Sequence, residues 1–506
     1  MAEHFTLIEL FTQKYKEARK VSAIEDDLAK DLQVLTTQDV IQKRNNSLPY
    51  GLESVALEQL DEEAEKRFNA CFPKYRKRIQ WSLSGKGIAG IRSKFYTAMA
   101  LSPSAKRALL VEDKKWSVYE LDEESNEPPQ LICTGKVTGE YSTGRDPITM
   151  RKAPLNWPQE SDQTDVVPLA TSPTSHSDTA TKSNEAIASA TEYSIAALAD
   201  NIAVLASPNG VLTVHNIQRE GRPVYRYVAP SAIRALAVSP NGSCVACGYT
   251  VYDSVSDIEE PIISLHRITP DVLNSRSYYN TFAEPTIAAL PIADPINTLT
   301  FSNDGAFLAC STIMQSRFMV INVSNADEPR VIMTSVRKID NSNESEGITS
   351  MRFFPGNRLL AITCRAYDAI PIIVDVMGSF VGSGATEDSG TIANSTLVTQ
   401  FPEVGSSVYS AAVSPRGNAI AFATNSGQVY VVSYSRLGLV DNSYTVVQVG
   451  KTVNANKITE APAMRWSPKG YTLLVLDRRG GLNLYNFAAG MPGSNGTEEC
   501  RVIQRA

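Results

Sequence analysis

The chain has 506 residues, of which 43% are hydrophobic and 20% charged, a balance typical of a folded globular protein. Its net charge is -6, so the chain as a whole lacks the positive charge that attracts a nucleic-acid backbone. No nucleic-acid partner is therefore expected. No stretch approaches the length of an uncharged apolar span, and the N-terminus carries charges in every turn, which argues against a membrane helix and a secretion signal. The seven scattered cysteines favour a reducing compartment, cytoplasmic or nuclear.

The first predicted unit is an N-terminal helical extension over residues 1–75. Its first helix has Leu7, Phe11 and Tyr15 on one face. In a second helix the apolar residues follow a 3.6-residue period, and they are Leu57, Leu60, Ala64, Phe68, Cys71 and Phe72. These are two amphipathic helices, and if they are not packed on the rest of the molecule they would form a docking element of the helix-in-groove kind.

A compact basic run follows the second helix and consists of Lys74, Arg76, Lys77 and Arg78. Such a run can bind an anionic surface or an import receptor, although it is more often a solvated face. Here it can also simply flank the apolar segment Ile79-Gln80-Trp81.

An internal repeat dominates the rest of the chain, from 76 to 506. Between 97 and 121 an apolar strand, a Ser-Pro turn, a second apolar strand, a polar turn and a third strand follow one another. The same phrase begins again at 233, 296, 348, 409 and 461, and a weaker copy occupies 194–217, which gives seven copies. In turns such as Ser239-Pro-Asn-Gly242, proline and glycine supply the backbone angles of a tight hairpin.

The flanking strands are apolar nearly throughout, as in AIAFAT from Ala419, so both faces of each sheet must be covered. Stacking the copies achieves this, and closing the stack into a ring leaves no terminal face exposed. The expected fold class is therefore all-β, a seven-bladed β-propeller with a short helical extension.

These phrases resemble the WD-repeat family over roughly 97–487. The family's terminal Trp-Asp is replaced here by Tyr119-Glu120, His215-Asn216, His266-Arg267, Ile321-Asn322, Val374-Asp375 and Tyr485-Asn486. The opening Gly-His pair is also missing, which implies that the family's Asp–His hydrogen-bond network is lost. The resemblance implies a WD-type propeller, with a related propeller family of diverged repeats as the alternative.

Residues 158–192 are rich in Ser, Thr and Asp and lack aromatic residues, so a disordered loop is predicted there. Within it, Ser172-Pro173 is a candidate proline-directed phosphorylation site, whose added charge could gate a partner. Longer loops between strands are also expected at 251–261, 377–400 and 435–460.

Motifs that could carry chemistry are weak. His215 and His266 lie in predicted strands without nearby ligands, which favours a structural role. Cys244 and Cys247 lie an odd number of residues apart in a strand, so their thiols should face opposite sides and bind no metal together. Gly85-Lys-Gly87-Ile-Ala-Gly90 matches a dinucleotide fingerprint in letters, but no helix follows it, and a turn is the better interpretation.

Arg478 and Arg479 resemble the Arg pair of phosphoinositide-binding propellers, although here they fall in the hairpin between two repeat strands, where an ordinary exposed turn is the simpler interpretation. No nucleophile elbow, phosphate loop or paired-carboxylate motif occurs, so catalysis, a cofactor and a metal are not expected.

The last blade needs a borrowed strand to close the ring. Arg78–Leu83 lies before the first copy, at the position of an outer strand, and Cys500–Gln504 follows the last copy. The N-terminal segment is favoured, because joining the chain ends across one blade removes an exposed edge, although both could pair.

The favoured function is a protein-protein interaction scaffold that binds partners through propeller loops and the N-terminal helices, without a small-molecule substrate. The alternative is a peripheral membrane protein that binds anionic lipid through the basic run and the pair Arg478 and Arg479. A propeller enzyme comes third.

Overall fold

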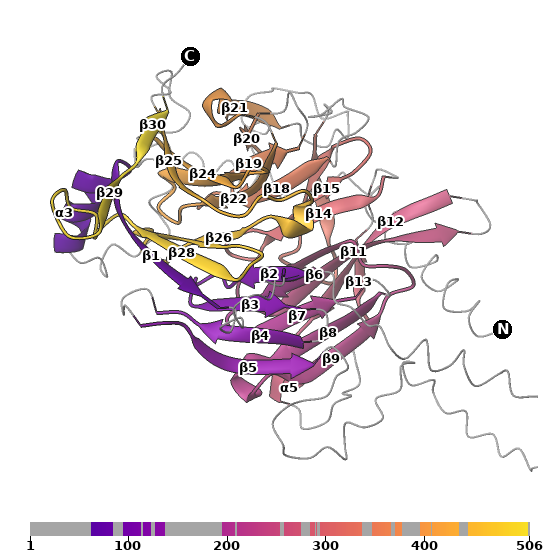
Figure 1. Cartoon of the computed structure of the whole chain (residues 1–506). Helices are drawn as coiled ribbons and strands as arrows, with labels where there is room; N and C mark the ends of the chain where they lie inside the picture. The colour runs from indigo at the N-terminus through magenta and orange to yellow at the C-terminus, as the bar shows by residue number, and fades with distance from the viewer. Residues whose placement is uncertain are drawn as a thin grey trace, which may run out of the picture.

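The computed structural model describes residues 62–83, 95–112, 115–122, 127–136, 195–207, 210–253, 258–274, 284–288, 290, 294–335, 347–365, 370–376, 395–405, 407–434 and 444–503. In these ranges the chain forms seven antiparallel sheets of four or five strands. They stand around a common axis, as Figure 1 shows. No helix among the described residues is long and apolar enough to cross a bilayer.

Each of the first three blades contains four strands in chain order. Blade 1 has β2 (Ala98–Leu101), β3 (Arg107–Val111), β4 (Lys115–Glu120) and β5 (Gln130–Lys136). Blade 2 has β6 (Ile195–Leu198), β7 (Ile202–Ala206), β8 (Val211–Asn216) and β9 (Arg222–Val228). Blade 3 has β10 (Ala235–Val238), β11 (Cys244–Asp253), β12 (Ile258–Arg267) and β13 (Thr286–Ala288).

The next three blades repeat this order. Blade 4 has β14 (Ile296–Phe301), β15 (Phe307–Thr312), β16 (Phe318–Asn322) and β17 (Arg330–Thr334). Blade 5 has β18 (Ile348–Phe353), β19 (Leu359–Cys364), β20 (Ile372–Asp375) and β21 (Thr396–Gln400). Blade 6 has β22 (Val408–Val413), β23 (Ala419–Thr424), β24 (Gln428–Tyr434) and β25 (Tyr444–Lys451).

Blade 7 is assembled from both parts of the chain, in the order β26-β27-β28-β1-β29. Its first three strands are β26 (Ala463–Trp466), β27 (Thr472–Leu476) and β28 (Gly481–Asn486), its fourth is β1 (Tyr75–Ser82), and β29 (Thr497–Glu499) adds a fifth. The innermost strand of each blade contacts that of the next, and β26 contacts β2, so the ring is closed. The predicted count of seven blades is confirmed.

The hairpin turns explain why the repeated phrase folds as it does. In the turn from Ser239 to Gly242, the Gly242 amide donates to the Ser239 carbonyl at 2.8 Å, and the glycine has φ of 72°. The Ser239 hydroxyl also accepts the Cys244 amide at 2.9 Å. The sequence Ser-Pro-x-Gly therefore supplies both the left-handed residue and the side-chain bond that end the first strand and start the second.

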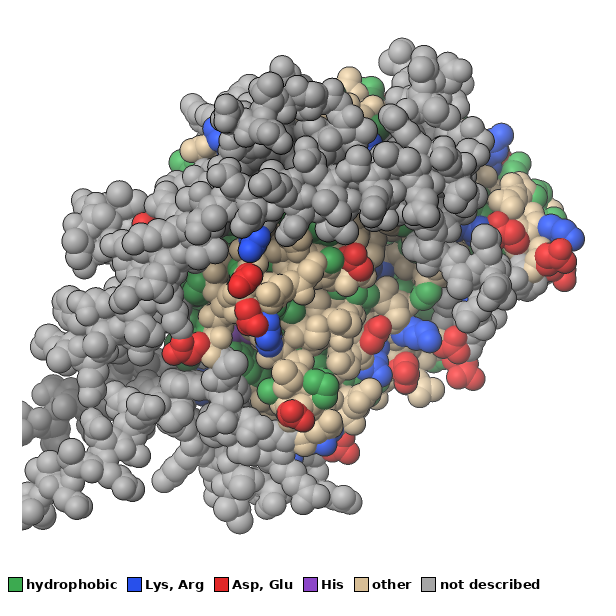
Figure 2. Space-filling view, turned by 180° about the vertical axis from the view of Figure 1, so that it is seen from behind, with side chains coloured by type: hydrophobic (Ala, Val, Ile, Leu, Met, Phe, Trp, Pro, Cys, Tyr) green, Lys and Arg blue, Asp and Glu red, His purple; other side chains and the backbone are tan. Residues whose placement is uncertain are grey.

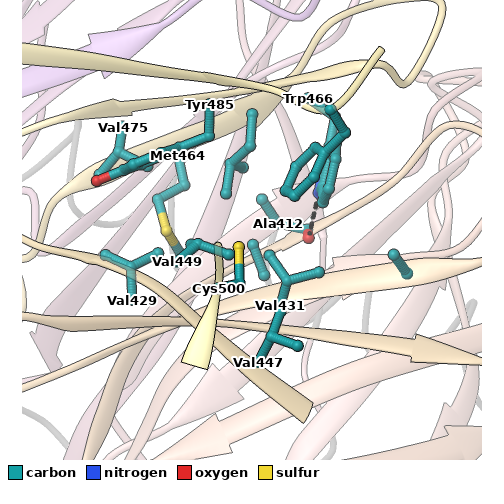
Figure 3. Packing of buried hydrophobic residues seen from close by; sticks show 14 of the residues in the cluster. Ala412, Val429, Val431, Val447, Val449, Met464, Trp466, Val475, Tyr485 and Cys500 are labelled. Atoms are coloured by element: carbon teal, nitrogen blue, oxygen red, sulfur yellow. Dashed lines mark hydrogen bonds between the residues drawn. The ribbon is translucent and has the colours of Figure 1, made fainter. Parts of the chain in front are cut away.

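The core of the ring lies between the blades. The described residues form seven hydrophobic clusters, one at each interface between neighbouring blades. Between blades 6 and 7, Val431 and Val447 face Met464 and Trp466 (Figure 3), and the Trp466 indole donates to the Ala412 carbonyl at 3.0 Å. Because the sheets bury both faces in this way, their strands read as apolar runs rather than alternating patterns.

The N-terminal segment closes the ring, as favoured from its position in the sequence. β1 pairs with β28 from Lys77 opposite Asn486 to Ser82 opposite Gly481. The second candidate does not complete blade 7, because β30 (Arg501–Ile503) crosses to blade 6 and pairs with β25 instead. Both ends of the described chain therefore meet at blades 6 and 7, as the indigo and yellow segments of Figure 1 show.

Helix α3 (Glu62–Cys71) falls within the second predicted helix and packs on the ring. Phe68 is buried in the cluster between blades 6 and 7, and the Arg416 guanidinium bonds both carboxylate oxygens of Glu65, at 2.9 and 2.5 Å. Tyr471 also donates to Glu65 at 2.9 Å. The part of the second predicted helix that the structure describes is thus not a free docking arm, because its Phe68 is buried against two blades.

Several other expectations have definite outcomes. The loops expected at 251–261, 377–400 and 435–460 are partly wrong, because β12, β21 and β25 begin inside those ranges. Residues 251–261 contain the ends of a hairpin whose paired strands extend to Asp253 and Ile258. A short helix that the sequence did not suggest, α5 (Pro270–Asn274), follows β12. The first predicted helix, the glycine motif 85–90, the loop 158–192 and Ser172 lie outside the described residues.

Candidate functional site

The turns between second and third strands and the connections between blades lie on one face of the ring, called here the top face. This follows from antiparallel pairing, because those turns and the start of each innermost strand share one end of the sheet. The hairpin turn 477–480 and the connections around Phe95 and Glu460 therefore gather on the top face, where blades 6, 7 and 1 meet.

An aromatic ring held between charged side chains marks this part of the top face. Phe95 is 47% exposed, and the guanidinium groups of Arg478 and Arg479 lie 4.2 and 5.5 Å from its ring centre. Arg478 also forms an ion pair with Glu460 at 2.8 Å. We call these four residues the Phe95 cluster. It combines a cation–π contact with an ion pair, which fixes the ring on the surface.

The backbone explains why the cluster is well placed. Asp477 accepts the amides of Arg479 and Gly481 through one carboxylate oxygen, each at 2.9 Å, so the turn is held by its first residue. The Tyr96 amide donates to the Arg478 carbonyl at 2.8 Å, which ties the entry to blade 1 onto blade 7. These bonds set the side chains of Phe95 and Arg478 next to each other.

A recess of about 400 Å³ opens beside the cluster. Its lining consists of Phe95, Thr452, Val453, Asn454, Arg478 and Arg479. One aromatic face, two guanidinium groups and the polar atoms of one connection line it, a composition suited to binding a protein side chain rather than to proton transfer.

The basic run is dispersed by the strand that contains it. Arg76 is buried, pairs with Glu498 at 2.9 Å and donates to the Cys500 sulfur at 3.2 Å. Arg78 donates to the Asn483 side-chain oxygen at 2.9 Å, Lys77 is partly exposed, and Lys74 is exposed.

The structure does not bring the run together with Arg478 and Arg479. Arg76 lies at the far end of β1 from Ser82, whose partner Gly481 follows the turn. Ser82 lies six positions along the strand from Arg76, roughly 20 Å at the usual rise. The two groups predicted as one anionic-surface contact therefore lie at opposite ends of blade 7.

Both strand histidines are buried and hydrogen-bonded. His215 contacts the Gly221 carbonyl at 3.0 Å and the Thr213 hydroxyl at 3.2 Å, while His266 contacts Tyr225 at 2.7 Å and Ser264 at 2.9 Å. Burial lowers the pKa of His215 to about 4 and that of His266 to about 3, so both are neutral near pH 7. Side chains that are fully enclosed and satisfied in this way stabilise the blades and cannot reach a substrate.

The cysteines are equally unsuited to chemistry. Cys247 lies in the cluster between blades 2 and 3, whereas Cys244 packs against the one between blades 3 and 4, so their thiols face opposite sides as expected. Burial raises the pKa of Cys244 to about 12 and also raises that of Cys247. Among the described residues no group of three His, Cys, Asp or Glu side chains could hold a metal ion.

The sequence singles out Arg478 and Arg479 but gives no sign that Phe95 and Glu460 are their partners. Phe95 precedes the first repeat and Glu460 precedes the last, so no spacing within a motif relates them. Phe95 contacts Arg478 only because the ring closes between blades 7 and 1, whereas Glu460 pairs with Arg478 within blade 7.

The blade order and the closing strand define a seven-bladed β-propeller, with an aromatic and arginine cluster on its top face. No family model matches the chain. Among curated proteins, the SPS-sensor component PTR3 of Saccharomyces cerevisiae is similar to it, with 31% identity over 460 residues. The alignment covers 88% of this chain and 61% of the yeast protein, so the chain spans about three fifths of that relative's length.

Among solved structures, the β-propeller domain of Cps50 (Swd1) from Myceliophteria thermophila is similar with a TM-score of 0.46 and 13% identity. That match covers 79% of this chain and 99% of the solved domain.

Proposed function

We propose that this chain is a non-catalytic scaffold that binds a protein partner at the Phe95 cluster. The observation that supports the proposal is the aromatic ring of Phe95, which remains 47% exposed although two guanidinium groups hold it in place. Exposed aromatic and arginine side chains beside a recess are the groups that dominate binding energy at protein interfaces. A rigid anchor also loses little conformational entropy on binding.

The similarity to a sensor component suggests the setting. We propose that this chain, like the yeast relative by its name, is one component of a sensing complex. We also propose that it works in the cytoplasm or nucleus, as the seven unpaired cysteines favour. It would then contribute binding surfaces, while another component would carry any catalytic step.

Binding to an anionic lipid surface is the competing function, and the contacts give it less support. Arg76 and Arg478 already pair with carboxylates, at 2.9 and 2.8 Å. Figure 2 shows acidic and basic side chains interspersed over the described part of one face, without a broad patch of one sign. Flotation with anionic liposomes tests this function directly, and the scaffold proposal expects the protein to stay at the bottom of the gradient.

The scaffold proposal is tested with two matched variants of the full chain, Phe95→Ser and Met314→Ser. Met314 is 76% exposed in the turn between β15 and β16, also on the top face but in blade 4. Quantitative affinity purification should show that Phe95→Ser loses a partner about tenfold or more, a loss typical of a central interface residue. Met314→Ser should retain it. Equal recovery of every partner by both variants and the wild type would contradict the proposal.

A further inference from the structure

The innermost strands place one residue of each blade in a single layer around the axis. These residues lie two positions before the residue that opens the first hairpin turn, and in blade order they are Ala100, Ala197, Ala237, Thr300, Arg352, Ala412 and Arg465. Each pairs with the third residue of the second strand of its blade, so the seven are structurally equivalent. Five are small, and two are arginines.

Arg352 extends across the inside of the ring. Its guanidinium donates to the Thr300 hydroxyl of blade 4 at 3.2 Å and to the Ala411 carbonyl of blade 6 at 3.1 Å, and it also bonds the Met351 carbonyl at 3.0 Å. Arg352 belongs to blade 5, and it bonds the innermost strands of both neighbouring blades. Because the innermost strands line the central channel, its guanidinium lies on the channel wall. Its second terminal nitrogen has no hydrogen bond to the described residues.

Arg465 occupies the position of blade 7 that is equivalent to Arg352, on the innermost strand and in the same layer. Its charge acts on Arg352 of blade 5 and on Asp200 of blade 2. No hydrogen bond or ion pair within the described part of the chain engages this guanidinium. The Asp200 carboxylate already accepts a bond from Ser104, so it compensates only part of the charge.

Two like charges in a partly dehydrated channel repel each other. Burial and the charge of Arg465 lower the pKa of Arg352 to about 9, so both groups remain protonated at neutral pH. Folding therefore keeps two cations together although the five equivalent positions show that alanine or threonine suffices for packing. A ligand with compensating charge would remove this cost.

We propose that the central channel is an anion-binding site, in which Arg352 and Arg465 hold a compact oxyanion of the phosphate class. Guanidinium groups donate in pairs to phosphate oxygens, so two of them in one layer suit an anion with several oxygens. The layer lies next to the first hairpin turns, on the face opposite the Phe95 cluster. The site is therefore separate from the proposed partner surface.

Thermal unfolding of the full chain tests this site, with potassium phosphate, pyrophosphate or inositol hexakisphosphate against potassium chloride of equal ionic strength. Anion binding to the folded state should raise the Tm of the wild type by about 3 °C at saturating ligand. The phosphate compound that raises the Tm most shows whether the site binds a single phosphate group or several. Arg465→Gln should abolish the rise, and Arg479→Gln, which alters a cation on the top face, should preserve it.

The same melts contain an internal control for folding. In chloride alone, Arg465→Gln should unfold at the wild-type Tm or above it, because the change relieves repulsion. Arg465→Lys should retain part of the phosphate effect. The proposal is overturned if none of the three phosphates raises the Tm beyond chloride, or if Arg465→Gln keeps the full rise.

Discussion

Blades 5 and 7 have the same three inner strands but differ in where their outer edge comes from. Blade 5 takes all four strands from a continuous stretch between Ile348 and Gln400. Blade 7 takes its fourth strand from Tyr75–Ser82 and its fifth from Thr497–Glu499. One blade is held by local hairpins, and the other is held by contacts between residues more than 400 positions apart, such as Arg76 with Glu498.

The difference shows that the folding of a single blade and the closure of the ring have separate requirements. Local hairpins form without the cost of closing a long loop, whereas blade 7 can be completed only when both chain regions are present. Ion pairs accompany this assembly: Arg76 pairs with Glu498 of the last strands, and Glu65 of helix α3 pairs with Arg416 of the neighbouring blade 6. Mutations that prevent closure should therefore cause the largest losses of stability.

Removal of the closing strand should have the largest effect. Deleting residues 1–84 removes β1 and α3, uncovers the edge of β28 and exposes the cluster around Phe68. The loss should exceed about 5 kcal/mol, comparable with the whole stability of many domains. Size-exclusion chromatography should show aggregates, and thermal unfolding should lose its cooperativity.

Deleting 496–506 is the matched control for this deletion. It removes β29, β30 and the Glu498 partner of Arg76 but leaves β1 paired with β28. That variant should remain folded with a cooperative transition, although the uncovered edge of β25 can pair with another chain at high concentration. The opposite pattern, with a tolerated N-terminal deletion and a disruptive C-terminal one, would mean that the ring is closed from the other end.

The sequence predicted the repeated parts well, because their physics is local. Turns such as Ser239–Gly242 carry their own signal, and apolar strands indicate sheets covered on both faces. The sequence could not predict that β30 joins blade 6, because three exposed or partly exposed residues, Arg501–Ile503, fit either edge. Nor could it predict the Phe95 cluster, because Phe95 contacts the two arginines only after closure.

Acid should destabilise blades 2 and 3 next most strongly. His215 and His266 have folded pKa values of about 4 and 3, below the ordinary value of 6.5, so protons bind preferentially to the unfolded chain. Stability is constant above about pH 6.5 and falls as the pH decreases toward the folded values. From pH 6.5 to 5 the two groups together should remove about 3 kcal/mol.

Urea unfolding at several pH values measures this loss. His266→Gln should flatten the slope of stability against pH by roughly half, even if the variant is less stable at pH 7. An unchanged slope would show that His266 is already charged in the folded protein, or that it is exposed.

Breaking the link between α3 and the ring should cost less. Glu65→Ala removes the partner of Arg416, whose side chain is only 9% exposed, and takes a hydrogen bond from Tyr471. Leaving that cation unpaired should cost about 2–3 kcal/mol, below the value for a fully buried pair because Glu65 is 27% exposed.

The ion pair of blade 5 between Arg358 and Asp375, at 2.6 Å, offers the comparison. Arg358 is 32% exposed and lies in the same blade as its partner, so Arg358→Ala should cost about 1 kcal/mol. Chemical denaturation measures both values. If the two substitutions cost the same, the contacts at the closure are no more important than those of a continuous blade.

The smallest effect should follow from removing β30 alone. Deleting 501–506 takes away three strand residues, of which Arg501 and Val502 are exposed, and keeps Cys500 in its buried place. The loss should be about 1 kcal/mol or less, since few apolar atoms leave the core. The edge of β25 from Val446 to Gln448 would nevertheless become free to pair with another chain. Light scattering at high concentration should therefore increase while the Tm stays nearly constant. A large drop in Tm without association would instead make β30 part of the closure itself, equal to β1 rather than a cover for the neighbouring edge.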